Sequence, residues 1–187
     1  FDDNKTPVEE TMSTYAELIK AGKVRYIAAS NVSPARLIES FDVAEKNGFP
    51  KYVALQPHYN LVERTTFEQE YVSLVNKYDL SVFPYWSLAA GFLTGKYRTE
   101  EDLGKSARGE GIKKYLNDSG KAVLKALDAV SQKHSTSQAT IALAWLLANP
   151  LITAPIVSAT SENQLKSLID APKIQLDKED LQMLDIR

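Results

Sequence analysis

Residues 82–98, VFPYWSLAAGFLTGKYR, carry side chains that together could bind a flat, anionic molecule. Tyr85 and Trp86 supply aromatic faces that stack on a flat ring, and Lys96 and Arg98 supply positive charge. The small residues between these pairs let backbone amides approach a phosphate. The stretch therefore favours a cofactor-binding loop, and the alternative is a strand, a turn and the start of a surface helix.

Polar side chains stand at the end of each of four apolar runs, which read AASN at 28–31, LQPHYN at 55–60, PYWSLAAG at 84–91 and IVSAT at 156–160. The side chains there that can hydrogen-bond an amide or a phosphate are Ser30, Asn31, Gln56, Ser158 and Thr160. Each alone is more often a capping residue or a strand-end hydrogen bonder. In a barrel the carboxyl ends of parallel strands meet at one rim, so the four successive placements favour a shared binding site.

The elements that position these residues follow from the hydrophobic pattern. Three apolar runs begin at equal spacing, at Val24, Tyr52 and Leu80, and a fourth begins at Ala154. Their lack of strict alternation predicts strands buried on both faces. N-cap residues, early carboxylates and helical spacing predict helices at 7–20, 34–47, 65–79, 135–148, from 161 onward and at 177–184.

Alternation of strands and helices at this length predicts parallel strands joined by right-handed crossovers. Residues 92–120 form a long polar excursion after the third strand, where α/β proteins place ligand contacts. A (β/α)8 barrel needs eight strands and about 250 residues. The alternative, an open doubly wound sheet, would show G-x-G-x-x-G after a strand, and this motif follows none of the four runs. We therefore expect an α/β fold in which residues 1–187 form half of a single barrel domain.

The composition bounds the class of protein. The chain has 187 residues, 44% hydrophobic and 25% charged, with a net charge of −2 and no cysteine. This predicts a globular domain in a reduced, cytoplasmic setting, with no basic surface for nucleic acid or membrane. Apolar runs stay below the roughly 18 residues that a bilayer span needs. His58 and His134 each lack a partner at the spacing of a nucleophile or metal site, so these residues alone predict binding without chemistry.

Longer stretches of the chain resemble the aldo/keto reductase family. They are TPVEET with AGKVRYIAASN, LQPHYNLVER, PYWSLAAGFLTGKYR and APIVSATSENQLKSLIDA, and the likeness is closest to bacterial members of the GFLTGKYR type. The resemblance implies a (β/α)8 TIM barrel that reduces aldehydes and ketones with NADPH, and it makes the four strands the fifth to eighth. The family's catalytic Asp, Tyr, Lys and His belong to the first four strands. We therefore expect the C-terminal half of the barrel, with no catalytic residue and no metal site, inactive without an N-terminal half.

The resemblance also implies which residues hold the cofactor. Ser30 and Asn31 would hold the nicotinamide carboxamide with Gln56 behind them, and Tyr85 would stack on the ring. The pyrophosphate would be wrapped by Trp86, Ser87, Leu88, Ala89, Ala90 and Gly91 and contacted by Thr94 and Lys96. Arg108, in SARGEG, would meet the 2′-phosphate. The loop for the adenosine phosphate would comprise Ser158, Ala159, Thr160 and Gln164.

Two departures from the family pattern concern the adenosine end. Ser158 stands where the family usually has Gly, and Ser167-Leu168 stands where a Glu-Asn pair often holds adenine. Two other functions fit the same motifs. One is a regulatory module that holds the cofactor, like the potassium-channel beta subunits that share the fold. The other is a noncatalytic half-barrel fragment that dimerises through its open edges. The sequence assigns neither a particular carbonyl substrate nor an oligomeric state.

Overall fold

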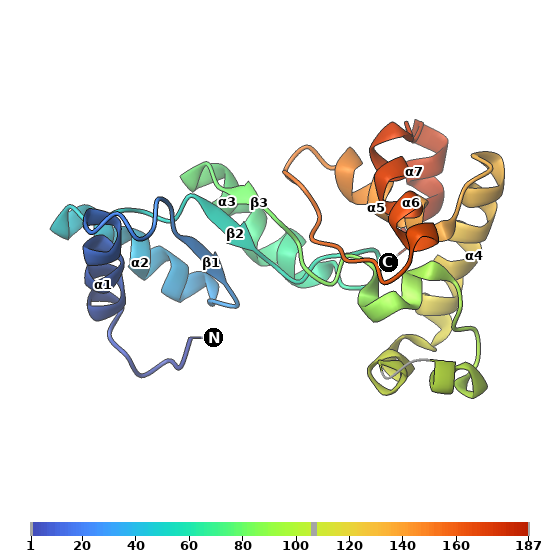
Figure 1. Ribbon diagram of the computed structural model, residues 1–187, viewed down its shortest axis with the longest axis horizontal. Coiled ribbons are helices and arrows are strands. Elements are labelled where there is room, and N and C mark those ends of the chain that lie inside the picture. Colours follow the sequence, from blue (N-terminus) through green and yellow to red (C-terminus); the bar gives the residue numbers. More distant parts are fainter. Residues whose placement is uncertain (1, 106–107, 187) are drawn as a thin grey trace. The chain divides into compact units, whose positions relative to one another are not determined.

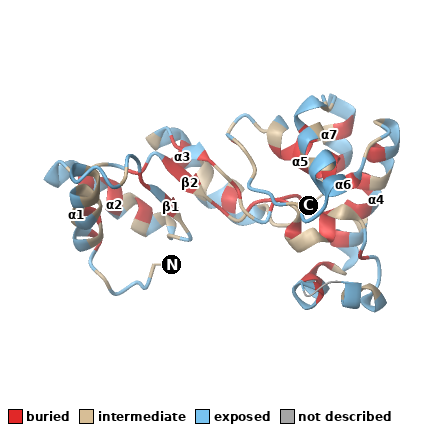
Figure 2. Ribbon diagram, viewed as in Figure 1, coloured by how far each residue is buried: buried red, intermediate tan, exposed pale blue. Residues whose placement is uncertain are grey.

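The computed structural model describes residues 2–105 and 108–186, and the chain divides into two compact units. The first comprises Phe1–Pro57 and Thr65–Phe83, and the second comprises His58–Arg64 and Pro84–Arg187. In Figure 1 the strands β1, β2 and β3 lie with α1, α2 and α3 in the first unit, and α4 to α7 lie in the second. Each unit has buried residues of its own (Figure 2).

The first unit is built on a small parallel sheet. Its strands are β1 (Ala28–Ser30), β2 (Ala54–Gln56) and β3 (Ser81–Val82), in the order β1-β2-β3. The register places Ser30 directly beside Gln56. The helices of this unit are α1 (Val8–Lys20), α2 (Pro34–Asn47) and α3 (Val72–Tyr78), the last entered through a π-helical turn, η1 (Phe67–Tyr71). The parallel pairing therefore has a helical crossover between successive strands, as the sequence predicted.

The ends of α2 show why the chain forms a helix there. The Ser33 hydroxyl accepts a hydrogen bond from the Arg36 backbone N–H at 3.3 Å, and Pro34 occupies the first helical position. Gly48 ends the helix in the left-handed conformation, with φ +67°. The buried side of α2 includes Leu37 and Phe41. The predicted helices at 7–20 and 34–47 are confirmed within one residue at each end.

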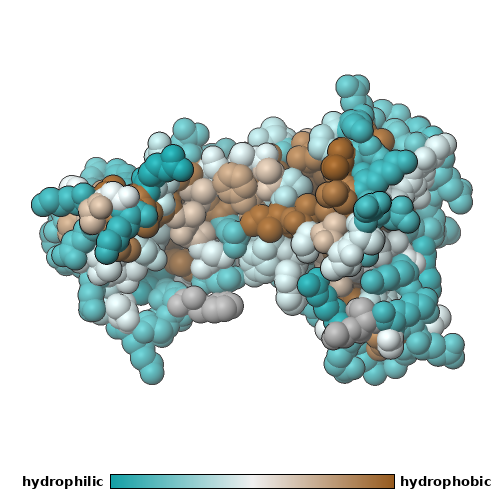
Figure 3. Space-filling model, in the orientation of Figure 1, coloured by the Kyte–Doolittle hydropathy of each residue, from teal (hydrophilic) through white to brown (hydrophobic). Residues whose placement is uncertain are grey.

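The second unit is helical. Its helices are α4 (Asp118–Lys133), α5 (Gln138–Ala148), α6 (Glu162–Asp170) and α7 (Lys178–Leu184). The 3₁₀ turns are η2 (Ala89–Thr94), η3 (Glu100–Lys105), η4 (Gly109–Tyr115) and η5 (Ala171–Lys173). Helix α5 is buried along almost its whole length, whereas α6 leaves Leu165 and Ile169 exposed. Figure 3 shows in brown where hydrophobic residues reach the surface.

The fourth predicted strand, beginning at Ala154, is not formed. The Ile156 N–H donates to the Pro84 carbonyl at 2.8 Å, but residues 154–159 do not continue into a paired strand. Ile156 and Val157 remain 42% and 38% exposed, so the segment lacks the two-sided burial that the pattern predicted. The structure therefore shows an α/β chain with three paired strands among the described residues, and the barrel half remains a prediction.

Two helices in the second unit differ from the sequence expectation. The long helix α4 was not predicted, although Val123, Leu124, Leu127 and Val130 recur at helical spacing and are buried. Helix α5 begins at Gln138 rather than Ser135, because the Ser137 hydroxyl accepts from the Thr140 N–H at 3.1 Å and caps it. Ser135 itself has φ +50°, outside helical geometry.

Candidate cofactor-binding site

Ser30, Asn31 and Gln56 meet at the carboxyl ends of β1 and β2. The Ser30 hydroxyl donates to the Gln56 carbonyl at 3.0 Å, and the Asn31 side-chain amide donates to the Ser30 hydroxyl at 3.3 Å. Asn31 turns the chain out of the strand with φ +54°, a conformation that Asn tolerates better than most residues. The structure thus brings together the three residues of the first unit that the resemblance assigns to one cofactor group.

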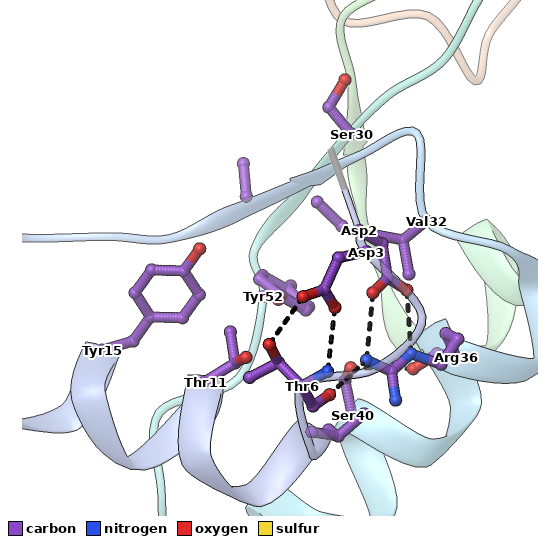
Figure 4. A pocket seen from close by; sticks show the side chains of 13 residues that line it. Asp2, Asp3, Thr6, Thr11, Tyr15, Ser30, Val32, Arg36, Ser40 and Tyr52 are labelled. Carbon is purple, nitrogen blue, oxygen red and sulfur yellow. Dashed lines mark hydrogen bonds and ion pairs between the residues drawn. The ribbon is translucent and has the colours of Figure 1, made fainter.

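A cavity of about 380 Å³ lies beside these residues, between the N-terminal segment, α1, α2 and β1. Figure 4 shows the Arg36 guanidinium facing Asp2, with the Asp3 carboxylate on Thr6. Arg36 Nε lies 2.8 Å from Asp2 Oδ2, which lowers the pKa of the Asp2 carboxyl. The Ser30 side chain points away from this pair (Figure 4). Arg36 and Asp2 therefore pair with each other, Asp3 is bound by Thr6, and the Ser30 hydroxyl joins neither group.

The rings of His58, Tyr85 and Trp86 lie together in the second unit. The His58 ring stacks on the Tyr85 ring with centroids 5.3 Å apart and planes 19° apart. Trp86 meets His58 edge-on, with a centroid distance of 5.4 Å and an interplanar angle of 82°. The backbones of His58 and Tyr85 form a parallel bridge, so their side chains leave the chain side by side. Trp86 is 54% exposed, so its ring also presents aromatic surface to solvent.

Asn60 connects these segments from a fully buried position, with a relative exposure of 0%. Its side-chain carbonyl accepts hydrogen bonds from the N–H groups of Val62 and Glu63, each at 3.0 Å. Its side-chain amide donates to the Trp86 carbonyl at 3.0 Å. The turn after His58 and the loop after Tyr85 are therefore joined through one buried amide side chain.

The loop 86–91 has an unusual backbone. Trp86, Ala89 and Ala90 have φ values of +52°, +48° and +56°, and Gly91 has φ +100°. Non-glycine residues adopt this region rarely and at a cost, and such residues cluster at ligand-binding segments. The Ala89 N–H donates to the Trp86 carbonyl at 2.7 Å and the Gly91 N–H to the Leu88 carbonyl at 2.9 Å. These bonds hold the loop in a tight curl.

Lys96 lies against this curl. A Cβ added at Gly91 would be 3.6 Å from the Lys96 Cε and 3.8 Å from its Nζ, so the ammonium group is directly beside the backbone of the loop. The Thr94 hydroxyl donates to the Gly91 carbonyl at 2.8 Å. Small residues, a bare backbone and a lysine are the donor set that phosphate recognition uses.

Two other cations of residues 96–108 are bound to carboxylates. The Arg98 guanidinium contacts both oxygens of Asp128 at 2.8 Å, and the Lys105 ammonium contacts Asp102 at 2.7 Å. Hydrogen bonds from Lys105 and from the N–H groups of Arg98 and Thr99 lower the pKa of Asp102 to about 2. Arg108 stands at the N-cap of η4 with an exposed side chain. Lys96, Arg98, Lys105 and Arg108 therefore lie in different surroundings, with the Lys105 ammonium also donating to the Lys96 carbonyl at 3.0 Å.

The segment 156–164 is tied to the loop after Tyr85. The buried Ser87 hydroxyl lies 3.1 Å from the Pro84 carbonyl and 3.0 Å from the Ile156 carbonyl. Ser161 caps α6, and the Gln164 side-chain carbonyl accepts from the Thr160 N–H at 2.9 Å and hydroxyl at 3.1 Å. Ser158 and Thr160 are exposed and Ala159 is half-buried. The residues assigned to the adenosine phosphate therefore form an exposed turn at the start of a helix.

Charged groups from η4 and from the turn after His58 act on the His58 ring. Burial lowers the pKa of His58, Glu63 opposes this change, and Lys114 reinforces it. Burial raises the pKa of Glu63, but hydrogen bonds from Lys114 and Tyr115 outweigh burial and the net direction is downward. Burial raises the pKa of Tyr115 to about 12. The environment therefore favours neutral His58 beside ionised Glu63.

His58 and Asn60 contact candidate site residues, and the sequence did not assign them to the site. A lone histidine and a single asparagine carry no spacing signal, and their roles depend on contacts with Tyr85 and Trp86 more than twenty positions away. Among residues 2–105 and 108–186, no helix is long and apolar enough to cross a membrane. Within those same ranges, no group of three or more His, Asp or Glu side chains could hold a metal ion.

The family model described as "Aldo/keto reductase family" matches residues 1–186 of this chain. An uncharacterized oxidoreductase, YrpG, of Bacillus subtilis (strain 168) is 34% identical over 184 residues, which cover 98% of this chain and 55% of that protein. The L-glyceraldehyde 3-phosphate reductase of Escherichia coli O157:H7 is 29% identical over 175 residues, covering 90% of this chain and 50% of the relative. The versiconal hemiacetal acetate reductase of Aspergillus parasiticus is 26% identical over 189 residues, which cover 98% of this chain and 54% of that protein. The chain spans about half the length of the curated relatives it matches.

Proposed function

This chain belongs to the aldo/keto reductase family, and from that premise we propose that it supplies most of the cofactor site of an NADPH-dependent carbonyl reductase. The relatives that are named reductases support an oxidoreductase that acts on small carbonyl compounds. The loop 86–91, with Lys96 beside it, is the observation that carries the proposal.

The residues of this loop fit a dinucleotide phosphate chemically. Gly91 has φ +100°, a conformation that favours glycine, and a Cβ there would contact the Lys96 side chain. Trp86 through Gly91, with Thr94 and Lys96, would hold the pyrophosphate, and Tyr85 would offer its ring to the nicotinamide. Ser30, Asn31 and Gln56 already form one hydrogen-bonded group suited to a carboxamide. We assign the 2′-phosphate to Arg108 and the adenosine phosphate to Ser158, Ala159, Thr160 and Gln164.

When bound, NADPH supplies the hydride for carbonyl reduction. The part of this chain in that reaction is to bind and orient the cofactor, because stacking on Tyr85 fixes which face of the ring is open. We propose that the proton donor and the rest of the barrel come from an N-terminal half encoded upstream of Phe1. Coverage of about half of each relative supports this, and reading the upstream coding sequence tests it directly. We also propose that the complete enzyme is cytoplasmic.

The isolated 187-residue chain is expected to show no carbonyl reductase activity. General acid–base groups contribute about 10²–10⁴-fold to such reactions, and the proposal places the proton donor outside this chain. Purified material of confirmed mass is assayed with NADPH and a panel of aldehydes and ketones. Turnover by that material would show that the chain holds its own proton donor.

The same panel, applied to the full-length protein, separates an enzyme from a regulatory module that only holds the cofactor. A reductase turns over at least one aldehyde or ketone in the panel at a rate well above background. A binding module titrates with NADPH but does not oxidise it.

Replacement of Tyr85 by alanine in the full-length protein is expected to weaken NADPH binding about threefold to tenfold. Aromatic stacking is worth roughly 0.5–1.5 kcal/mol beyond the area that it buries. Fluorescence titration of NADPH gives the dissociation constant, and Tyr85→Phe is the matched control because it keeps the ring. An unchanged dissociation constant in Tyr85→Ala would mean that the ring only packs against His58.

A further inference from the structure

His58 covers one face of the Tyr85 ring. The two rings lie 5.3 Å apart and 19° from parallel, and the backbone bridge between the residues fixes their separation. A flat ligand that stacks on Tyr85 must use the opposite face. Any tilt of the Tyr85 ring is therefore resisted from the side that the ligand does not touch, by His58 and by the edge of Trp86.

Asn60 determines which nitrogen of His58 carries the proton. The Asn60 side-chain carbonyl already accepts two backbone N–H groups, so the orientation of this amide is fixed with its NH₂ group on the other side. That NH₂ group donates to the Trp86 carbonyl and lies 3.4 Å from His58 Nε2. Nε2 must therefore be an acceptor, since a proton there would face another N–H. The neutral imidazole with its proton on Nδ1 is the form that fits.

We propose that His58, held by Asn60 as a neutral imidazole, is a positioning residue that sets the plane of the Tyr85 ring for nicotinamide stacking. This inference rests on the proposed cofactor function and deepens it. His58 acts through Tyr85 and does not contact the reacting atoms. Protonation adds a donor at Nε2 and breaks its fit with Asn60, so the binding-competent form is lost as pH falls through the pKa of His58.

The pH dependence of NADPH binding can be assigned to His58 by considering the other groups that face its ring. Glu63 lies on the same turn, Lys114 comes from η4, and Tyr85 and Trp86 come from the neighbouring loop. Glu63 is held by Lys114 and Tyr115 with its pKa lowered, so it stays ionised while His58 titrates. The part of the acid loss of NADPH affinity that His58→Phe abolishes is therefore attributed to His58.

The test measures NADPH dissociation constants by fluorescence titration of the full-length protein. His58→Ala is expected to weaken binding about threefold to tenfold at pH 7.5, as loss of one aromatic contact predicts. His58→Phe keeps a flat ring and is expected to restore affinity to within about twofold at pH 7.5. It should lose less affinity than the parent at pH 5.5, where only protonation of the cofactor's 2′-phosphate still weakens binding. In a Tyr85→Ala background, His58→Ala is expected to add no further loss, because its effect passes through the Tyr85 ring.

Imidazole ¹⁵N chemical shifts supply a readout that does not involve the cofactor. We expect unprotonated Nε2 and protonated Nδ1 in His58 at pH 7.5, and an Asn60→Ala variant should lose this preference. If the parent protein does not bind NADPH, the proposed function fails and this inference fails with it. If the parent binds NADPH but His58→Ala binds equally well, or if Nε2 carries the proton, only the role of His58 is overturned.

Discussion

Replacement of Arg108 by alanine in the full-length protein is expected to weaken NADPH binding about 10- to 150-fold and to leave NADH binding nearly unchanged. The reason is that a charge-assisted hydrogen bond to phosphate contributes roughly 1.5–3 kcal/mol. Arg108 occupies the position that the family resemblance assigns to the 2′-phosphate, which NADH lacks. Its side chain is exposed at the start of η4.

Two matched variants separate this role from general loss of charge. Lys96→Ala removes the ammonium beside Gly91, which the pyrophosphate of both cofactors would meet, so it should weaken NADPH and NADH alike. Arg98→Ala removes a cation that Asp128 holds and should leave the ratio of the two affinities unchanged. Titrations across a salt series should reduce the NADPH preference of the parent as screening increases. Equal weakening of both cofactors by Arg108→Ala would remove its assignment to the 2′-phosphate.

Replacement of Asp180 by asparagine is expected to lower the free energy of unfolding by about 2–4 kcal/mol. The Asp180 carboxylate is fully buried and joins α7 to the end of α4, with Lys133 Nζ and His134 Nε2 each 2.8 Å from one of its oxygens. It also completes the capping box of α7 with Asp177. Asparagine keeps the shape but removes the buried negative charge that Lys133 and His134 contact. Urea unfolding followed by circular dichroism measures the change.

The same group predicts an acid limit for stability. Burial raises the pKa of Asp180, but hydrogen bonds from Lys133, His134 and the Asp177 backbone outweigh it and lower the pKa to about 2. Because the folded pKa lies below the unfolded value of about 3.9, the stabilisation is present above about pH 4 and is lost as pH falls toward about 2. Asp180→Asn should flatten that part of the pH profile. Asp170→Asn, which removes an exposed pair with Lys173, should change stability by less than about 1 kcal/mol.

The sequence predicted the helices whose first residues are fixed by a capping side chain close by in the sequence. Ser33, Ser161 and Asp177 cap helices where the pattern placed them, because a cap depends on residues three positions apart. The predicted fourth strand was wrong because a strand needs a paired partner, and residues 154–159 are bound through Ile156 to Pro84 and Ser87 without forming a ladder. Helix α4 has apolar residues at helical spacing. Its first turn lies within the polar residues 92–120, so the hydrophobic pattern does not mark where the helix begins.

The candidate site also contains residues that local sequence signals indicated and residues that they did not. Type and spacing were enough to propose Tyr85, Lys96 and the small residues between them as candidates, and the placement of Ser30 beside Gln56 followed from the strand ends. The left-handed conformations of Trp86, Ala89 and Ala90 could not be found, because these residue types usually avoid that region. Asn60 gave no sequence signal, since its role depends on burial and on the Trp86 carbonyl.

The curled loop between Trp86 and Gly91 also affects which groups determine ligand affinity, its backbone or the side chains around it. Each left-handed residue opposes folding by about 1 kcal/mol or more, and short backbone hydrogen bonds keep the loop in place. This conformational free energy is spent when the chain folds, so ligand binding does not have to supply it again. A ligand therefore meets a preorganised surface and gives up little loop entropy. If this ligand is the proposed dinucleotide, the side chains that touch its phosphates would distinguish NADPH from NADH, mainly through different dissociation rates.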